Sequence, residues 1–360
     1  MITRLRKLPI FALCAILLAL LSATFIIWNH SELKTRVLHG CISEKTSLED
    51  CYIAYYRDIS DQRGTKFALE QLHDRQTTDS RLSANCHQAI HSIGRAAFRE
   101  YGSIAKAYAQ ADYSCWGGYL HGVVEASMRG KVLSDIAGDT LRTMCDSVKE
   151  GGETSFAHFS CIHGLGHALM YVGHNDLPAV LTHCDDLVDV WEIRQCANGA
   201  FMENTLADSA HPSNFQPKDD AHFPCNIVRE DERDVCYQVQ SPFIMEQMKG
   251  DFTKAFAFCD ELSVNAERTL CVQGLGAEVS TYMSHDPKKI AQLCAAVPPP
   301  SDRDCFYGAL TDLEGVDGGP GLGRVVCQNL TGEAQVRCLQ ILDKAHKAFP
   351  GAMSSADLKK

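Results

Sequence analysis

The sequence predicts an all-α protein: a superhelical array of disulfide-stapled helical hairpins, an α-solenoid-like fold with repeats of about 34 residues, behind one N-terminal transmembrane helix. A stapled hairpin here means two helices whose connecting turn is spanned by a disulfide. Three observations predict this fold. Twelve of the 17 cysteines form six pairs of similar spacing, the last four of these pairs repeat at a regular interval, and an uncharged apolar segment follows a basic N-terminus.

The N-terminal segment has the length of a membrane anchor. Residues 1–7 contain Arg4, Arg6 and Lys7, and residues 8–28 contain no charged side chain. A helix rises about 1.5 Å per residue, so residues 8–28 reach about 30 Å, the thickness of a bilayer core. A cleaved signal peptide is the alternative, but its apolar stretch is usually only about 7 to 15 residues long.

We therefore expect an uncleaved signal anchor at residues 8–28, through which the membrane is a partner of the chain. Because the basic residues precede the span, residues 1–7 should be cytoplasmic and the main domain periplasmic, extracellular or lumenal. The net charge of −11 argues against nucleic acid as a partner, since such a protein needs a basic surface.

The cysteines outside the anchor predict the repeat. Six pairs have members ten to twelve residues apart, and the first members of the last four pairs follow at steps of 34, 35 and 33 residues. A period of this size is typical of stacked helical hairpins. The six predicted pairs are Cys41–Cys51, Cys184–Cys196, Cys225–Cys236, Cys259–Cys271, Cys294–Cys305 and Cys327–Cys338.

Zinc is the alternative explanation for so many cysteines. Structural zinc sites typically use C-x₂₋₄-C pairs, and no two cysteines of this chain are that close. Disulfides fit the spacing better and agree with a compartment outside the cytoplasm. Each would close a loop of about a dozen residues and contribute about 3 kcal/mol to stability. Only Cys14, within the anchor, is expected to be a free thiol.

Glycine recurs three residues after the second cysteine. Glycine inside a helix costs about 1 kcal/mol relative to alanine, so its recurrence needs a structural reason. Close approach between neighbouring helices is the simpler interpretation, and a ligand role is the alternative. The five glycines are Gly118, Gly164, Gly199, Gly274 and Gly308.

The remaining boundaries follow from this pattern. A linker and the first stapled hairpin are expected at 29–80, and a histidine-rich helical region at 81–206. Residues 207–224 interrupt the array as a long polar loop, which is either a lid or binding loop or a disordered excursion. Stapled helical repeats follow at 225–345 and a tail at 346–360.

Histidines concentrate in the middle of the chain. Seven of the 15 histidines lie between residues 87 and 174, and several are four residues apart. Residues four apart lie on one face of a helix, with about 5–6 Å between their Cβ atoms. Three helices therefore present stripes of polar side chains. The stripes are His87, His91 and Arg95; His121 and Glu125; and His163, His167 and Tyr171.

The repeat provides an internal comparison for these stripes. His121 and His167 both lie six residues after a cysteine, so they should point to the same side of adjacent hairpins. In later helices this position holds other residues, which means that the scaffold does not require histidine there. Those residues are Met202, Ala277 and Thr311.

The stripes predict a transition-metal site. Imidazole binds zinc, copper and iron, and a carboxylate extends the choice to manganese, so the identity of the metal stays open. The glutamate of an H-E-x-x-H motif is missing, which argues against a zincin-type protease. A buried network of hydrogen-bonded histidines is the alternative. The predicted ligands are His87, His91, His121, Glu125, His163 and His167, which are enough for one full site or for a two-metal site.

Four side chains are candidates for catalysis around this metal. Glu125 is a ligand or a general base, and Glu203 is a further ligand, a general base or an acceptor for an imidazole N–H. Arg95 and Tyr171 lie one helical turn beyond histidines, where they could orient an anionic substrate.

The sequence therefore predicts a membrane-anchored extracytoplasmic metal-dependent enzyme, hydrolytic or redox, whose substrate it does not specify. A non-catalytic transition-metal carrier or sensor is one alternative. The other is a helical-repeat interaction scaffold, with a protein partner on the C-terminal repeats.

Overall fold

The regular elements of the chain are helices. The computed structural model describes residues 48–348 apart from 77, 80, 83–85, 150–154, 207–212, 217–219 and 316–318, and these described residues contain no strand. Contacts divide the chain into two compact units, Met1–Tyr55 and Tyr56–Lys360. The histidine cluster and the seven disulfides described below lie in the second unit.

The predicted anchor at residues 8–28 lies outside the described residues, as does the segment 1–7 before it. Among the helices of the described range, none combines the length and the apolar character that a membrane span requires. Membrane anchoring therefore stays a prediction.

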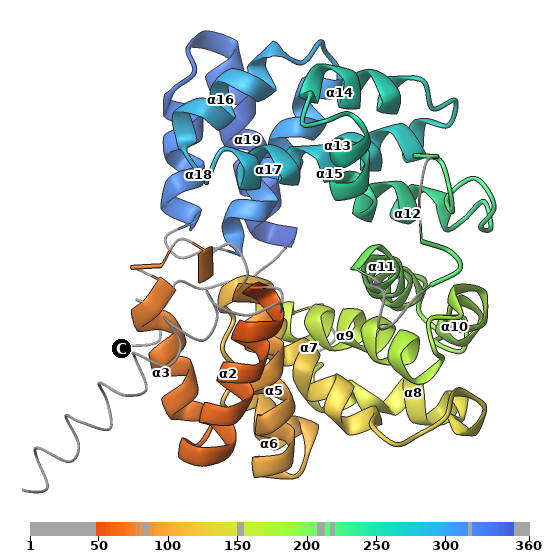
Figure 1. Cartoon of the computed structure of the whole chain (residues 1–360). Coiled ribbons are helices and arrows are strands. Elements are labelled where there is room, and N and C mark those ends of the chain that lie inside the picture. Colours follow the sequence, from red (N-terminus) through yellow and green to blue (C-terminus); the bar gives the residue numbers. More distant parts are fainter. Residues whose placement is uncertain are drawn as a thin grey trace, which may run out of the picture. The chain divides into compact units, whose positions relative to one another are not determined.

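Eight helices pack in chain order, each against the next, so that the sequence neighbours of the repeat are also neighbours in space (Figure 1). They are α5 (Cys86–Tyr101), α7 (Ser114–Met128), α9 (Phe156–Val172), α11 (Val190–Leu206), α12 (Arg233–Val239), α15 (Asn265–Tyr282), α17 (Ser301–Glu314) and α19 (Gly332–Ala348).

Shorter helices pack beside this series. Four of them lie against the long helix that follows each in the chain: α10 (Leu177–Cys184), α14 (Phe252–Asp260), α16 (Pro287–Ala296) and α18 (Gly319–Gln328). The other helices are α2 (Leu48–Arg63), α3 (Thr65–Gln76), α6 (Ile104–Tyr108), α8 (Gly138–Met144) and α13 (Ser241–Gln247), with short 3₁₀ turns at Leu133–Asp135 and Asp146–Val148.

Seven disulfides join cysteines of the described residues, with Cα–Cα distances of 5.4 to 5.8 Å. The five pairs predicted between residues 184 and 338 are confirmed. Two further disulfides are Cys86–Cys115 and Cys145–Cys161, which span 29 and 16 residues. Cys51 is also disulfide-bonded, but its predicted partner Cys41 lies outside the described residues.

A distinctive turn recurs where α9, α13 and α15 end. Two consecutive residues adopt left-handed backbone conformations, and an aspartate follows whose side chain accepts hydrogen bonds from the first N–H groups of the next helix. Left-handed conformations are costly for residues other than glycine, so the recurrence shows that the turn geometry itself is required. The copies are His174-Asn175-Asp176, Lys249-Gly250-Asp251 and Ser284-His285-Asp286.

The predicted close approach of helices at glycine is confirmed. A Cβ atom added to any of the five glycines would lie less than 3.0 Å from the backbone of a facing helix. Gly199, for example, faces the carbonyl of His163, and Gly308 faces that of Gln273. A side chain at these positions would force the helices apart, so glycine sets the spacing between them.

The helix α7 begins with a left-handed turn. Cys115, Trp116 and Gly117 have φ angles of 51°, 59° and 66°, and the right-handed helix continues from Gly118. Such strained backbone is found mostly at functional sites, where surrounding contacts hold it in place. Here the Cys86–Cys115 disulfide ties the turn to α5.

The predicted loop at 207–224 is partly described. The Asn204 side chain, at the end of α11, donates a 2.8 Å hydrogen bond to the Phe215 carbonyl and also contacts the buried Ser213 hydroxyl. These contacts fix residues 213–216 against α11, while a role as a lid stays a prediction. At the other end, α19 continues to Ala348 and so extends into the predicted tail 346–360.

Candidate metal centre

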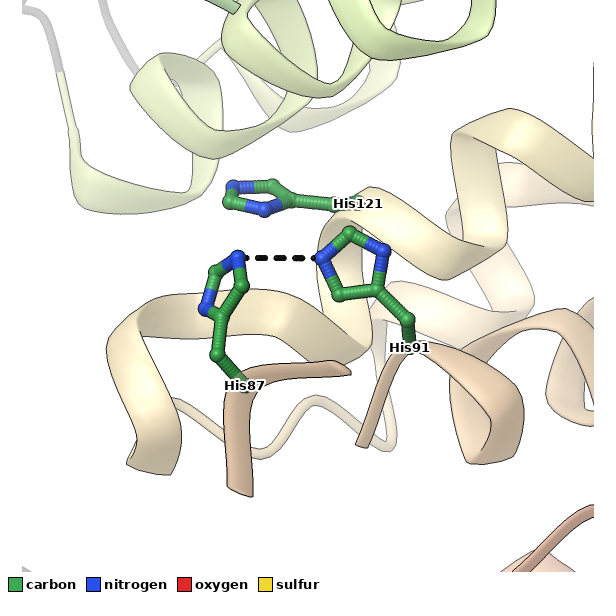
Figure 2. Close-up of side chains that lie close together, drawn as sticks. All are labelled: His87, His91 and His121. Carbon is green, nitrogen blue, oxygen red and sulfur yellow. Dashed lines mark hydrogen bonds between the residues drawn. The ribbon is translucent and has the colours of Figure 1, made fainter. Parts of the chain in front are cut away.

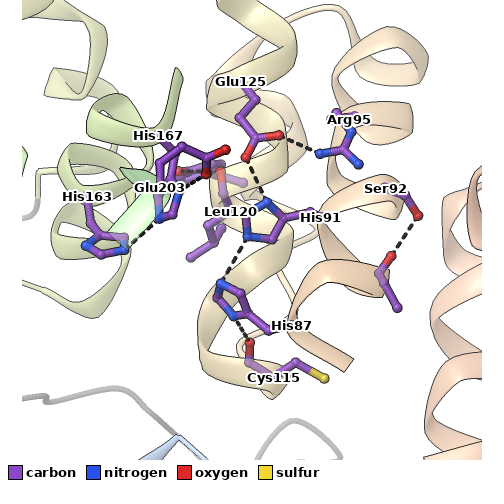
Figure 3. Close-up of polar contacts among 12 residues, drawn as sticks. His87, His91, Ser92, Arg95, Cys115, Leu120, Glu125, His163, His167 and Glu203 are labelled. Carbon is purple, nitrogen blue, oxygen red and sulfur yellow. Dashed lines mark hydrogen bonds and ion pairs between the residues drawn. The ribbon is translucent and has the colours of Figure 1, made fainter. Parts of the chain in front are cut away.

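The five predicted histidine ligands converge. His87 and His91 come from α5, His121 from α7, and His163 and His167 from α9. Centroids of neighbouring rings lie 4.7 to 5.8 Å apart. Four rings are buried and His87 is half-buried. Figure 3 shows four of these rings between the three helices.

Glycine makes this convergence possible. A Cβ at Gly118 would lie 2.7 Å from the carbonyl oxygen of His87 and 2.9 Å from the ring of His91. A Cβ at Gly164 would lie 2.9 Å from the Cα of His121. The helices α5, α7 and α9 therefore approach closely at the level of the histidines, where larger residues would keep the rings apart.

The rings form two groups of three that share one member. In the first group, ligand atoms of His87, His91 and His121 lie within 4.8 Å of one another. In the second, the same limit holds for His121, His163 and His167. Figure 2 shows the His121 ring lying over the pair formed by His87 and His91.

Both histidines of α5 contact oxygen atoms through Nδ1. The Nδ1 atom of His87 lies 2.7 Å from the carbonyl oxygen of Cys115, and the Nδ1 atom of His91 lies 2.7 Å from Oε1 of Glu125. The other carboxylate oxygen of Glu125 accepts a 2.6 Å hydrogen bond from Arg95. A carbonyl and a carboxylate only accept hydrogen bonds, so each ring donates from Nδ1, and a neutral ring in this tautomer presents a bare Nε2.

These two Nε2 atoms face each other at 3.1 Å, as the dashed line in Figure 2 marks. The α9 pair repeats part of this arrangement, because Nε2 of His167 lies 3.0 Å from Nε2 of His163 and its Nδ1 lies 2.7 Å from Oε2 of Glu203. The buried Nδ1 atom of His163, in contrast to that of His87, has no hydrogen-bond partner among the described residues. In both helices a carboxylate from the following long helix therefore orients the second histidine.

His121 differs from the other four. Both of its ring nitrogens are buried, and neither has a hydrogen-bond partner among the described residues. A neutral imidazole has one N–H donor and one acceptor. Burying both without partners costs about 2 kcal/mol or more. The ring therefore neighbours both histidine pairs while its polar atoms have no protein partner among the described residues.

Burial favours neutral rings. Burial, with a further contribution from His91, lowers the pKa of His87 to about 3. Burial and the surrounding imidazoles hold the pKa of His121 and that of His163 well below the usual value. Burial alone would raise the pKa of Glu125, but His91 and Arg95 hold that pKa well below its usual range. His87, His121 and His163 thus offer neutral nitrogen donors, and the carboxylate of Glu125 behind His91 is ionised.

The other predicted site residues lie at the edge of the cluster. Both oxygens of Glu125 bond to protein groups, and Glu203 accepts from His167, which is one of the three roles considered for it. Arg95 contacts Glu125. Tyr171 is 50% exposed. Direct ligation by Glu125 and catalytic roles for these four side chains stay predictions.

Two features of the centre were not found from the sequence. The carbonyl of Cys115, which fixes the tautomer of His87, carries no residue-type signal, because any residue has a carbonyl. The pairing of Glu125 with His91 crosses between helices, whereas the sequence groups Glu125 with His121. His158, a further histidine of α9, lies outside the two groups and pairs with Glu192 at 3.1 Å.

Comparison of the chain with protein-family models, with curated proteins and with solved structures gives no match in any of the three. Inferences about function therefore rest on the geometry of the histidine cluster.

Proposed function

We propose that this protein binds transition-metal ions through the five-histidine cluster. The observation that carries the proposal is the 3.1 Å contact between Nε2 of His87 and Nε2 of His91. Because both Nδ1 atoms donate to oxygen, two lone pairs face each other, and such a contact is repulsive unless a cation lies between them. A metal ion bound at about 2.0–2.1 Å from each nitrogen would form an N–metal–N angle of about 100° at this separation.

A proton is the competing cation. It would convert His91 into an imidazolium ion beside Glu125, and the cluster would be a hydrogen-bonded network. Two features favour a metal over this proton. Arg95 already balances the charge of Glu125 at 2.6 Å, and a proton on His91 leaves both nitrogens of His121 unsatisfied.

The donor set favours zinc, copper, iron or nickel over manganese. Both groups that could hold an ion consist of histidine alone, and imidazole suits zinc, copper, iron and nickel better than manganese. Glu125 and Glu203 accept from Nδ1 atoms behind the cluster, an arrangement in which carboxylates orient histidine ligands and strengthen them as donors.

The finer proposal is a metal-dependent enzyme, hydrolytic or redox. Three histidines leave one position of a tetrahedral ion open, as catalytic zinc sites do, and a bound metal there could activate water or exchange electrons. A carrier or sensor is the second candidate, favoured by the deep burial of four of the five rings. Seven disulfides support a location in an oxidising compartment, and we propose that residues 8–28 anchor a superhelical array of stapled hairpins there.

Elemental analysis tests the proposal. Full-length protein, produced without a metal-affinity tag and loaded with zinc or copper, should retain metal after gel filtration, and the double variant H87A/H91A should retain much less. The control variant H158Q alters an equally buried histidine of α9 outside the cluster and should retain metal as the wild type does. Wild-type protein that retains no metal would contradict the proposal. Azide that shifts the spectrum of a cobalt-loaded form would favour the enzyme over a saturated carrier.

A further inference from the structure

We infer that the cluster holds two metal ions and that the ring of His121 bridges them, one ion on each of its nitrogens. This inference rests on the proposed metal binding and adds the number of ions and the nature of their link. One ion would be held by His87 and His91 from α5, the other by His163 and His167 from α9, and His121 would complete both groups.

The division of the ligand atoms argues against one central ion. Nitrogens that bind the same ion must all lie close to one another, because each is bound at about 2.1 Å. The five histidines do not form a single close set; they form two sets of three, and only His121 belongs to both. Each set includes one pair of facing Nε2 atoms, at 3.1 Å in α5 and 3.0 Å in α9. The cluster therefore has two places for an ion.

The orphaned nitrogens of His121 argue for the bridge. The ring of His121 neighbours both pairs: its centroid is 5.3 Å from those of His87 and His91, and 4.8 and 5.5 Å from those of His163 and His167. One ion would satisfy a single nitrogen of His121 and leave the other buried and unpaired, at a cost of the order of 1–3 kcal/mol. Two ions satisfy both nitrogens.

Bridging has a definite proton balance. The neutral His121 ring carries one N–H, and the second ion can bind there only when that proton leaves to solvent. The product is an imidazolate whose two nitrogen lone pairs bind one ion each. Each of the four other rings would bind an ion through the nitrogen that carries no proton and would keep the N–H on its other nitrogen. His121 is therefore the one histidine of the cluster that would lose a ring proton.

Copper(II) provides a direct test, because an imidazolate couples two copper spins magnetically whereas separate ions give independent signals. Full-length protein would be titrated with copper(II), and bound copper and integrated electron paramagnetic resonance intensity would be measured at low temperature. We expect intensity to rise up to one ion per chain and to fall when the second ion binds. The variant H121A should lose this decrease, and the control variant H158Q should keep it.

Two results would contradict the bridging role of His121 while leaving the proposed metal binding intact. These are saturation at one copper per chain, or two bound coppers whose intensity equals that of two independent ions. Wild-type protein that binds no copper or zinc would instead contradict the proposed function itself. The titration of wild-type protein is decisive alone, so the test stands even where H121A fails to fold.

Discussion

The Nδ1 atom of His91 lies 2.7 Å from Oε1 of Glu125, and this contact joins α5 to α7 directly behind the histidine cluster. Carboxylates in this position fix the tautomer of a histidine ligand and raise its basicity. We expect E125Q to weaken metal binding by about 10- to 100-fold, because the amide lacks the charge and leaves Arg95 without its partner. Competition with a chelator of known affinity would measure the change.

The matched control is E333Q. Glu333 also pairs with an arginine, Arg337, but its side chain is 96% exposed on α19. This variant should bind metal as the wild type does. Equal metal affinity of E125Q and E333Q would show that Glu125 does not support the histidine.

We expect two of the disulfides to differ in their effect on metal affinity. Cys86 directly precedes His87, and the carbonyl of Cys115 fixes the tautomer of that ring. We expect C86S/C115S to lower both stability, by about 3 kcal/mol, and metal affinity, because the left-handed turn at the start of α7 is released. Denaturant unfolding and chelator competition would measure the two effects.

The Cys327–Cys338 disulfide provides the comparison, since it joins α18 to α19 at a distance in sequence from the histidines. The variant C327S/C338S should lose a similar amount of stability and keep its metal affinity. If both double variants kept the wild-type metal affinity, the turn at Cys115 would have no role in positioning His87.

Much of this architecture could be predicted from the sequence because it depends on local spacing. The four-residue interval between His87 and His91 places both on one face of a helix whatever the tertiary structure is. The glycine at a fixed offset from cysteine indicated close packing, and Gly164 and Gly199 do lie against facing backbones. The interval between cysteines indicated the hairpins for the same reason.

Contacts between helices were harder to predict. Counting from cysteine treats the residues after Cys115 as a regular helix, but three left-handed residues intervene before Gly118. The same count makes Glu278 equivalent to Glu203, yet Glu203 accepts from a histidine whereas Glu278 contacts Ser241. Which side chain a residue meets depends on the neighbouring helix, and its register is not encoded in local spacing.

Helix spacing at glycine leads to a prediction that does not involve metal. A Cβ at Gly308 would overlap the backbone of Gln273, so G308A should destabilise the protein by about 1–3 kcal/mol or more. The control is G321A in α18, where the exposed glycine has nothing within 4 Å of an added Cβ and alanine is the better helix former. Denaturant unfolding should therefore give G308A a free energy of unfolding well below that of the wild type. The free energy of unfolding of G321A should equal or exceed that of the wild type. The reverse order would refute the spacing argument.

The carboxyl of Glu278 predicts a pH dependence of stability. Burial, with a further contribution from Asp312, raises the pKa of Glu278 to about 7 from its reference value of 4.5. The folded protein therefore binds this proton more tightly than the unfolded chain does, and the resulting stability is fully present below pH 4.5 and is lost as the pH rises through 7. The expected loss is about 1–3 kcal/mol. The variant E278Q cannot ionise, so the stability of E278Q relative to wild type should increase by this amount between pH 4 and pH 8. The control variant E333Q, which alters an exposed side chain, should show no such increase. A difference in the free energy of unfolding between E278Q and wild type that does not change with pH would mean that Glu278 ionises as readily in the folded protein as in the unfolded chain.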